Sequence, residues 1–430
     1  MIYLLNPRFR LEHLIIPGKG KIYFVSSQDG TGKAVVLDGV ATRLMKVLVR
    51  LSRVNTVNPS ELNALRHLEY EGVVANECSD ETNEVGSFPT ESLQFWIQTS
   101  DRCNLACTYC YIPSLNSAKP RRPDLFSLLG EKLLEVNGLK NVSIKLAGGE
   151  PLLCFEEWAD EVVLLKQSLA DAGIRLTIRI ITNMTFLNKK IIEYVKQHDV
   201  IMSVSLDGLE QFNDMNRIFP KSGRGTFYVV RKNLQILQEN GIKPSVMITA
   251  TSENKTGVGD LVKYLVEHDF TFRVSDAKGG HIQAKEFELA FQDVKKVLSD
   301  AVKLGFPVSK RLVVSDLRTL SPQAQPCSMG TTAAAIYLDG SVYFCHTEFE
   351  EGEPLGSLDE SDNLISIIRR GYVKQLGLSQ DCQSCEYRIV CAGGCPLYRE
   401  NGKSPMCSTY KKIIPQIFEL YDQEKCDIRV

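Results

Sequence analysis

The stretch LQFWIQTSDRCNLACTYC, residues 93–110, joins a strand-like run to a short loop that contains three cysteines. Its first eight residues are rich in aromatic and β-branched side chains, which is typical of a strand. Cys103, Cys107 and Cys110 follow with gaps of three and two residues. A closed structural zinc or iron–sulfur site takes four ligands, so three thiols leave one position for a bound molecule. The alternatives are a fourth ligand from elsewhere in the chain, or plain buried thiols.

Five further strand-like runs follow, separated by amphipathic stretches whose apolar residues recur at three and four positions. The strand-like runs are residues 142–149, 175–183, 201–208, 244–251 and 270–276, and the helical stretches include 158–173 and 261–269. This alternation implies right-handed crossovers and a parallel sheet. Six such units predict an α/β fold containing a partial (β/α)6 TIM-like barrel.

Unusual residues follow each of the first four predicted strands. The cysteine loop follows the first strand, Gly148–Gly149–Glu150–Pro151 the second, Thr182–Asn183 the third, and Ser205–Leu206–Asp207–Gly208 the fourth, before Asp214 and Arg217. In parallel barrels the reactive groups collect at the carboxyl ends of the strands. Taken singly, the GGEP segment also fits a simple turn and Arg217 a solvated helix residue. Their joint placement on one rim favours a single site.

These motifs resemble those of the radical S-adenosylmethionine enzymes, whose cysteines are spaced Cys-x3-Cys-x2-Cys with an aromatic residue, here Tyr109, before the third. The resemblance implies a [4Fe–4S] cluster on Cys103, Cys107 and Cys110, with the fourth iron binding S-adenosylmethionine. It also implies that the GGE segment holds the methionine ammonium, that Asn183 and Ser205 contact the ribose or methionyl part, and that Arg217 pairs with the carboxylate. The implied cofactor contacts are Tyr109, Gly148, Gly149, Glu150, Asn183, Ser205 and Arg217. The family often has glycine after Thr-Asn, where this chain has Met184.

A second group of seven cysteines occupies the end of the chain. They are Cys327, Cys345, Cys382, Cys385, Cys391, Cys395 and Cys407, and four residues separate Gly340 from Cys345. This spacing resembles the SPASM domain, which implies that Cys382, Cys385, Cys391 and Cys407 hold an outer cluster and Cys327, Cys345 and Cys395 an inner one. Zinc knuckles are the alternative. The inner set lacks a fourth thiol, which leaves either an open iron or a ligand from His346, Glu348 or Cys426.

Composition limits the class of protein. The chain has 430 residues, more than one compact core usually holds, with 43% hydrophobic and 24% charged residues. A net charge of -2 gives no reason to expect nucleic acid or an anionic membrane. No apolar run is long enough to span a bilayer, and charged residues interrupt the beginning of the chain, so we expect a cytoplasmic protein. Thirteen cysteines in that compartment favour metal or redox chemistry over disulfides, with Cys78, Cys154 and Cys426 as ordinary small hydrophobic residues.

The front of the chain has a different pattern. Residues 20–38 alternate like a hairpin around QDGTG, residues 40–51 are amphipathic, and Asn58 precedes a second helical stretch as a candidate cap. This arrangement resembles the winged-helix module that binds the leader of precursor peptides, and a simple cap on the barrel is the alternative. We expect three domains: a winged-helix-like module at 1–88, the partial barrel at 89–305 and a cysteine-rich iron–sulfur domain at 306–430.

The combined resemblance implies a peptide-modifying enzyme that cleaves S-adenosylmethionine reductively and uses the 5′-deoxyadenosyl radical to abstract hydrogen from a ribosomally made precursor peptide. Its cofactors would be S-adenosylmethionine and three [4Fe–4S] clusters. Its partners would be a precursor peptide with a leader and an electron donor such as flavodoxin or ferredoxin. The alternatives are an anaerobic sulfatase maturase that makes formylglycine, and a non-catalytic iron–sulfur or zinc scaffold.

Overall fold

The computed structural model describes residues 2–5, 9–16, 20–27, 35–37, 39–51, 53–55, 58–70, 73–76, 90–112, 119–320, 323 and 325–424. The chain divides into two compact units. The barrel unit comprises Pro89–Ser315 and Ser328–Leu376, and the second unit comprises Met1–Phe88, Asp316–Cys327 and Gly377–Val430. The domain boundaries expected from the sequence stay predictions.

The barrel unit contains a sheet whose strand order is β13-β12-β11-β10-β9-β8-β7-β14-β15-β16. The six predicted strands are all present and pair in parallel. They are β7 (Ser92–Ser100), β8 (Asn141–Gly148), β9 (Arg175–Thr182), β10 (Ile201–Ser205), β11 (Ser245–Ala250) and β12 (Thr271–Asp276). The prediction of an α/β fold with a partial parallel barrel is therefore confirmed.

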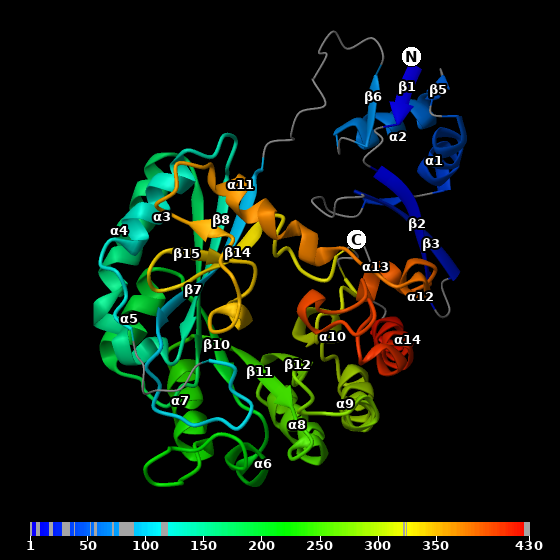
Figure 1. Cartoon of the computed structure of the whole chain (residues 1–430). Coiled ribbons are helices and arrows are strands. Elements are labelled where there is room, and N and C mark those ends of the chain that lie inside the picture. The colour runs from blue at the N-terminus through cyan, green and yellow to red at the C-terminus, as the bar shows by residue number, and fades with distance from the viewer. Residues whose placement is uncertain are drawn as a thin grey trace. The chain divides into compact units, whose positions relative to one another are not determined.

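Helices cover the outer face of this curved sheet (Figure 1). They are α3 (Leu125–Leu134), α4 (Ala159–Asp171), α5 (Lys189–Gln197), α6 (Glu210–Asp214), α7 (Phe227–Glu239), α8 (Val258–Glu267) and α9 (Ala284–Lys303), with the short α10 (Val308–Arg311), η1 (Pro151–Glu157) and η2 (Lys255–Gly257). Alternate strand residues such as Phe95, Ile144 and Ile178 are fully buried beneath them. The intervening residues, which we call the inner face, are mostly polar and mostly half-buried.

Four strands extend the sheet beyond the six that the sequence predicted. They are β13 (Leu312–Val314), β14 (Ala333–Ile336), β15 (Ser341–Tyr343) and β16 (Gly356–Ser357), followed by α11 (Leu364–Arg370) and η4 (Gly371–Gln375). Strand β14 pairs in parallel with β7, with Ala335 beside Trp96. Its sequence, AAAI, has weak strand propensity, so pairing with an available edge rather than local preference forms this strand.

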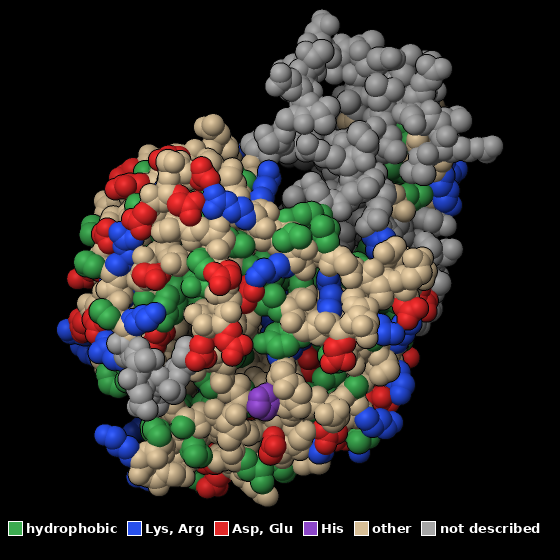
Figure 2. Space-filling view, in the orientation of Figure 1, with side chains coloured by type: hydrophobic (Ala, Val, Ile, Leu, Met, Phe, Trp, Pro, Cys, Tyr) green, Lys and Arg blue, Asp and Glu red, His purple; other side chains and the backbone are tan. Residues whose placement is uncertain are grey.

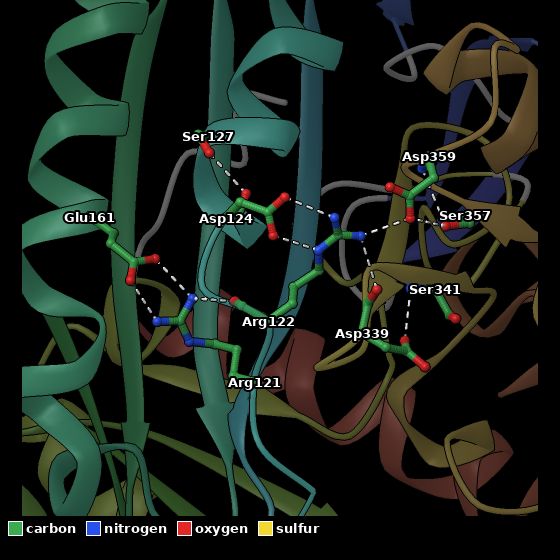
Figure 3. Close-up of polar contacts among 9 residues, drawn as sticks. All are labelled: Arg121, Arg122, Asp124, Ser127, Glu161, Asp339, Ser341, Ser357 and Asp359. Atoms are coloured by element: carbon green, nitrogen blue, oxygen red, sulfur yellow. Dashed lines mark hydrogen bonds and ion pairs between the residues drawn. The ribbon is translucent and has the colours of Figure 1, made fainter.

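An arginine fork fastens the β14–β16 segment to the chain before α3 (Figure 3). Arg122 donates from Nε to Asp124 at 2.7 Å and from Nη1 to Asp359 at 2.7 Å. Gly340 lies beside this fork with a φ of +91°, and a Cβ atom there would stand 3.0 Å from Arg122 Nη1. The glycine in the Gly340-x4-Cys345 spacing is thus explained by a left-handed turn against a packed guanidinium.

The described residues of the second unit before residue 77 form two three-stranded sheets and two helices. The elements are β1 (Ile2–Leu5), β2 (Phe9–Ile16), β3 (Gly20–Ser27), β4 (Val35–Leu37), α1 (Gly39–Leu51), β5 (Arg53–Asn55), α2 (Pro59–Tyr70) and β6 (Val74–Asn76). The predicted hairpin is confirmed by the antiparallel pairing of β3 with β4, although its QDGTG turn lies outside the described residues. Asn58 Oδ1 accepts the Ser60 N–H at 3.0 Å, which confirms the predicted cap.

The remaining elements of the second unit are short apart from one long helix. They are α12 (Gln380–Gln383), α13 (Arg388–Cys391), η5 (Pro396–Tyr398) and α14 (Cys407–Gln423). Within the described part of the chain, no helix has the length and apolar character needed to cross a bilayer. Acidic and basic side chains are interspersed over the face of the molecule seen in Figure 2, in keeping with the small net charge.

Candidate active site and cluster-binding cysteines

The three-cysteine loop begins where β7 ends and is held by backbone hydrogen bonds to a distant segment. The Ala106 N–H donates to Ile218 O at 2.9 Å, and the Thr108 N–H donates to Asn216 O at 3.1 Å. Cys103 and Cys107 are half-buried, whereas Cys110 is exposed. The loop therefore presents its thiols from a fixed backbone at the carboxyl end of the first barrel strand.

The two glycines of GGEP are required by a close backbone approach. A Cβ atom on Gly148 would lie 2.2 Å from Ser100 O, and one on Gly149 would lie 2.2 Å from Arg102 O. The Gly149 N–H donates to Ser100 O at 2.7 Å, and the Glu150 N–H donates to Arg102 O at 2.8 Å. The end of β8 therefore packs directly against the start of the cysteine loop. The GGEP segment is not a simple turn, because its two glycines allow this backbone contact.

Glu150 links the end of β8 to the end of β9. Its buried carboxylate accepts the Asn183 N–H at 2.6 Å, the Thr182 Oγ1 hydroxyl at 2.7 Å and the Leu152 N–H at 3.0 Å. Burial raises the pKa of Glu150 to about 7, although these donors favour the ionised form. The Glu150 side chain is therefore held by hydrogen-bond donors of the protein itself, at the carboxyl ends of β8 and β9.

Asn183 extends this network to the cysteine loop. Its Nδ2 donates to Asn104 Oδ1 at 3.0 Å and lies 3.7 Å from Cys103 Sγ. The next residue, Met184, is fully buried and has a φ of +54°, in the left-handed region that favours glycine. The backbone at Met184 therefore has a conformation that glycine would suit, although a buried methionine occupies the position.

Tyr109, Asp207 and Arg217 form a buried polar cluster. The Tyr109 hydroxyl donates to Asp207 Oδ2, and Arg217 Nη1 donates to the Tyr109 hydroxyl and lies 3.3 Å from Asp207 Oδ2. Asp207 Oδ1 also accepts the Thr249 N–H at 2.8 Å. Within the described residues, Arg217 Nε is buried without a hydrogen-bond partner. Arg217 is therefore a buried residue and not a solvated surface residue. Its Nε–H remains as a hydrogen-bond donor for a bound group.

Asn216 is a polar residue that the sequence did not single out, whereas Asp207 stood among the residues after the fourth strand without a role of its own. Asn216 Oδ1 accepts a hydrogen bond from the Thr108 hydroxyl at 2.7 Å, and Asn216 Nδ2 donates to Thr251 Oγ1 at 3.0 Å. This side chain therefore joins the cysteine loop to the end of β11. Asn216 also follows the fourth strand, which is the positional signal that could have identified it. Ser205 lies on the inner face at the end of β10, half-buried and beside Met247 in the ladder.

Four cysteines of the second unit line one pocket. Cys382, Cys385, Cys391 and Cys407 line this pocket together with Lys411 and other residues, and about 20 Å³ of it is accessible to water. The turn after Cys391 is formed by three consecutive residues with positive φ, of 48°, 75° and 72°. Four converging thiols around a pocket fit the donor set of a tetrathiolate iron–sulfur cluster.

The other three tail cysteines are distributed over both units. Cys327 and Cys395 of the second unit each lie close enough to Arg399 to influence its pKa, which burial lowers. Cys345 belongs to the barrel unit, where His346 Nδ1 lies 3.5 Å from its Sγ. The His346 ring stacks on Trp96 with ring centroids 3.7 Å apart, and Glu348 forms an ion pair with Lys374. Cys426 lies outside the described residues.

All eleven cysteines in the described part of the chain are free thiols. Across those same residues, no three His, Cys, Asp or Glu side chains are grouped closely enough to hold a single metal ion. The isolated Cys154 is buried, as the sequence predicted for a small hydrophobic residue.

Comparisons with known proteins agree with this geometry. Residues 97–265 match the model of the Radical SAM superfamily. The chain is 23% identical over 355 residues to the cysteine-type anaerobic sulfatase-maturating enzyme of Clostridium perfringens, covering 74% of this chain and 94% of the relative. The solved structure of native anSMEcpe with bound AdoMet and the Cp18Cys peptide has a TM-score of 0.65 at 20% identity and covers 77% of this chain and 97% of that one.

A second solved relative covers more of the chain. SuiB of Streptococcus suis, at 16% identity, covers 94% of this chain and 98% of its own. Its TM-score is 0.53 for the structure bound to S-adenosylmethionine and 0.50 for the structure bound to the precursor peptide SuiA. At these identities both structures share their fold with this chain.

Proposed function

We propose that this chain, a radical SAM enzyme that uses S-adenosylmethionine and iron–sulfur chemistry, modifies a ribosomally made precursor peptide. The observation that carries this proposal is the extent of the match to SuiB, which covers 94% of the chain, whereas the match to anSMEcpe covers 77%. SuiB has been solved with its precursor peptide.

In this proposal Cys103, Cys107 and Cys110 hold the cluster that binds S-adenosylmethionine. When bound, the cluster and S-adenosylmethionine would supply the radical chemistry that removes a hydrogen atom from an unreactive C–H bond. Three thiols at the carboxyl rim of the barrel fit a site that keeps one coordination position for a cofactor.

The chain's own residues would orient the cofactor around that position. Arg217, held by Tyr109 and Asp207, keeps its Nε as a donor for a carboxylate. Asn183 follows β9, and Ser205 is the last residue of the neighbouring strand β10, so both lie at the same rim. Backbone carbonyls of Gly148 and Gly149 would accept the methionine ammonium, while the Glu150 carboxylate braces the segment that presents them.

We also propose two auxiliary [4Fe–4S] clusters. Cys382, Cys385, Cys391 and Cys407 would hold the outer one in the pocket that they line. Cys327, Cys345 and Cys395 would hold the inner one. Such clusters would take up the electron released when a bond forms in the peptide, and a flavodoxin or ferredoxin would exchange electrons with the enzyme.

The front of the chain would bind the leader of the precursor. The antiparallel β2–β3–β4 sheet offers edges to which an extended peptide could add a strand. A cap on the barrel is the rival role for this region.

The second candidate function is that of an anaerobic sulfatase maturase. Its support is the similarity over 355 residues to the enzyme of Clostridium perfringens and the higher TM-score of anSMEcpe. In that case the substrate would be a Cys or Ser side chain of a sulfatase, converted to formylglycine.

Mass spectrometry separates the two candidates. The reconstituted full-length enzyme would be incubated with S-adenosylmethionine, reductant and either a short precursor peptide encoded next to its gene or a sulfatase peptide with Cys or Ser. We expect 5′-deoxyadenosine together with a mass change in the precursor only, and weaker binding of a leaderless precursor. Formylglycine in the sulfatase peptide with an unmodified precursor would favour the second candidate. A colourless zinc protein without 5′-deoxyadenosine would exclude both.

A further inference from the structure

Three segments of the barrel unit flank the cysteine loop, residues 103–110, and are hydrogen-bonded to the loop or to the residue before it. The bonds are Glu150 N–H to Arg102 O at 2.8 Å, Asn104 Nδ2 to Thr185 Oγ1 at 2.9 Å, and Thr108 N–H to Asn216 O at 3.1 Å. We call residues 150–157, 183–190 and 215–225 the flanking segments. Their side chains therefore form the surface next to the three thiols.

Each flanking segment has one large apolar side chain that is exposed to solvent. Leu153 is 40% exposed, Phe186 40% and Met215 48%. Exposed apolar residues that are scattered singly are normal on a protein surface, but these three stand beside bonds to the same loop. Cys110, at the end of that loop, is exposed as well. Apolar surface thus gathers around the cysteines.

The third flanking segment adds two positive charges. Lys221 and Arg224 lie on the exposed turn of a hairpin that is closed by the bridge between Ile218 and Gly225. The same hairpin is tied to the cysteine loop, because Ile218 O accepts the Ala106 N–H at 2.9 Å. In the described part of the chain, neither Lys221 nor Arg224 forms an ion pair. Their charges therefore face solvent beside the loop.

The flanking segments do not offset these two charges with acidic residues of their own. Their exposed carboxylates are those of Glu156 and Glu157. Glu156 pairs with Lys190 at 2.9 Å, and Glu157 pairs with Arg102. The surface around the cysteine loop therefore combines three apolar side chains with an uncompensated positive rim.

This combination fits a transient, negatively charged protein partner. Protein interfaces place apolar side chains at the centre and polar ones at the rim, and Met and aromatic residues are enriched there. Opposite charges on the two rims speed the encounter without requiring a large contact area. Electron-transfer complexes are among the smallest specific interfaces, whereas stable subunit contacts need much more buried area. A patch of this size beside cysteines that would bind a redox cluster therefore suits an electron carrier.

We propose that Leu153, Phe186, Met215, Lys221 and Arg224 form a docking surface for the acidic one-electron carrier protein that reduces the cluster on the cysteine loop. This inference rests on the proposed function, since it takes the loop to hold that cluster. One electron passes from the carrier to the oxidised cluster, so the carrier is oxidised by one electron and no covalent bond forms or breaks. The positive rim steers the carrier, and the apolar side chains exclude water between the two redox groups.

The test titrates flavodoxin, an acidic carrier, into the reconstituted full-length enzyme by calorimetry at low ionic strength. The double variant Lys221→Glu, Arg224→Glu, which we call the charge variant, should raise the dissociation constant about tenfold. Phe186→Ala should raise it about fivefold. The matched control is Lys196→Glu with Lys263→Glu, because both lysines are exposed on the outer helices α5 and α8, and it should keep the wild-type value.

A second readout separates docking from the chemistry. Formation of 5′-deoxyadenosine is measured with reduced flavodoxin and, in parallel, with dithionite, a small reductant that needs no docking surface. We expect the charge variant to lose most of the flavodoxin-driven rate and to keep the dithionite-driven rate. An unchanged dissociation constant for flavodoxin in the charge variant overturns the proposal.

Other occupants of the surface would give different results. Loss of precursor binding in Phe186→Ala with normal flavodoxin binding would assign the surface to the peptide. A change from dimer to monomer in the same variant, again with normal flavodoxin binding, would assign it to a second copy of this chain. Either result overturns the proposal.

These outcomes are distinguishable from failure of the proposed function. A precursor that is modified equally well with flavodoxin by the wild type and by the charge variant refutes the docking surface alone. Flavodoxin binding that requires these residues, in an enzyme that modifies no precursor, refutes the proposed function alone.

Discussion

The carboxylate of Glu150 accepts the backbone N–H of Asn183 at 2.6 Å. This bond joins the ends of β8 and β9 beneath the cysteine loop, and the Asn183 side chain reaches Asn104 and the vicinity of Cys103. The GGEP segment and Asn183, which the sequence presents as separate cofactor contacts, therefore belong to one hydrogen-bond network that reaches the cysteine loop.

Glu150→Gln should change how stability depends on pH. Burial raises the folded-state pKa of Glu150 from 4.5 to about 7, so its contribution to stability is fully present below pH 4.5 and is lost as the pH rises through 7. The loss amounts to about 3 kcal/mol at 1.36 kcal/mol per pKa unit. Urea unfolding from pH 4.5 to 8 should show the wild type falling relative to the variant. Parallel pH profiles would contradict this expectation.

Replacing Cys103, Cys107 and Cys110 together by Ala should abolish cleavage of S-adenosylmethionine while the auxiliary clusters remain. Iron content should fall by about one cluster's worth. Cys154→Ala is the control, because Cys154 is a buried thiol whose Sγ lies against Pro151 O and Thr99 Oγ1 and belongs to neither group of cysteines, so this variant should leave the iron content unchanged. Continued formation of 5′-deoxyadenosine in the triple variant would refute the assignment of the loop.

Arg217→Lys should weaken the binding of S-adenosylmethionine by about 1–3 kcal/mol, since an ammonium cannot reproduce a guanidinium fork. The free Arg217 Nε is the donor at stake. Arg224→Lys, on an exposed position of the same segment, is the control and should bind the cofactor normally. Equal dissociation constants for both variants would leave Arg217 with a structural role only.

Tyr109→Phe should destabilise the fold by about 1–3 kcal/mol, because it removes the hydroxyl that lies between the buried Asp207 and Arg217. Tyr228 offers a matched comparison: its exposed hydroxyl donates to Glu210 at 2.6 Å. Tyr228→Phe should therefore change the free energy of unfolding by less than about 0.5 kcal/mol. Similar losses in both variants would argue against a special role for the buried cluster.

Met184→Gly should be less destabilising than Met184→Ala. Both variants lose a buried side chain, which costs about 2–5 kcal/mol. Only glycine relieves the left-handed backbone, by about 1 kcal/mol, whereas glycine in regular structure is usually worse than alanine by about 0.5–1 kcal/mol. Thermal unfolding of the two variants decides the order, and a more stable alanine variant would show that the backbone strain is small.

The sequence by itself determined the barrel strands and the places where its reactive residues stand. Strand runs such as 93–100 and 175–183 have a local signal, and the carboxyl ends of parallel strands meet at one rim whatever the details of packing. The cysteine spacing likewise follows from covalent neighbours, so Cys103, Cys107 and Cys110 could be grouped without a structure.

Only the tertiary structure decided which partners the polar residues meet. Arg217 contacts Tyr109 and Asp207, which lie on different loops, and no local pattern encodes that pairing. Strand β14 forms because β7 offers an unpaired edge, since its own alanines have little strand preference. The register that sets Trp96 beside Lys145, and Lys145 beside Arg179, also depends on long-range strand pairing, which the linear sequence does not contain.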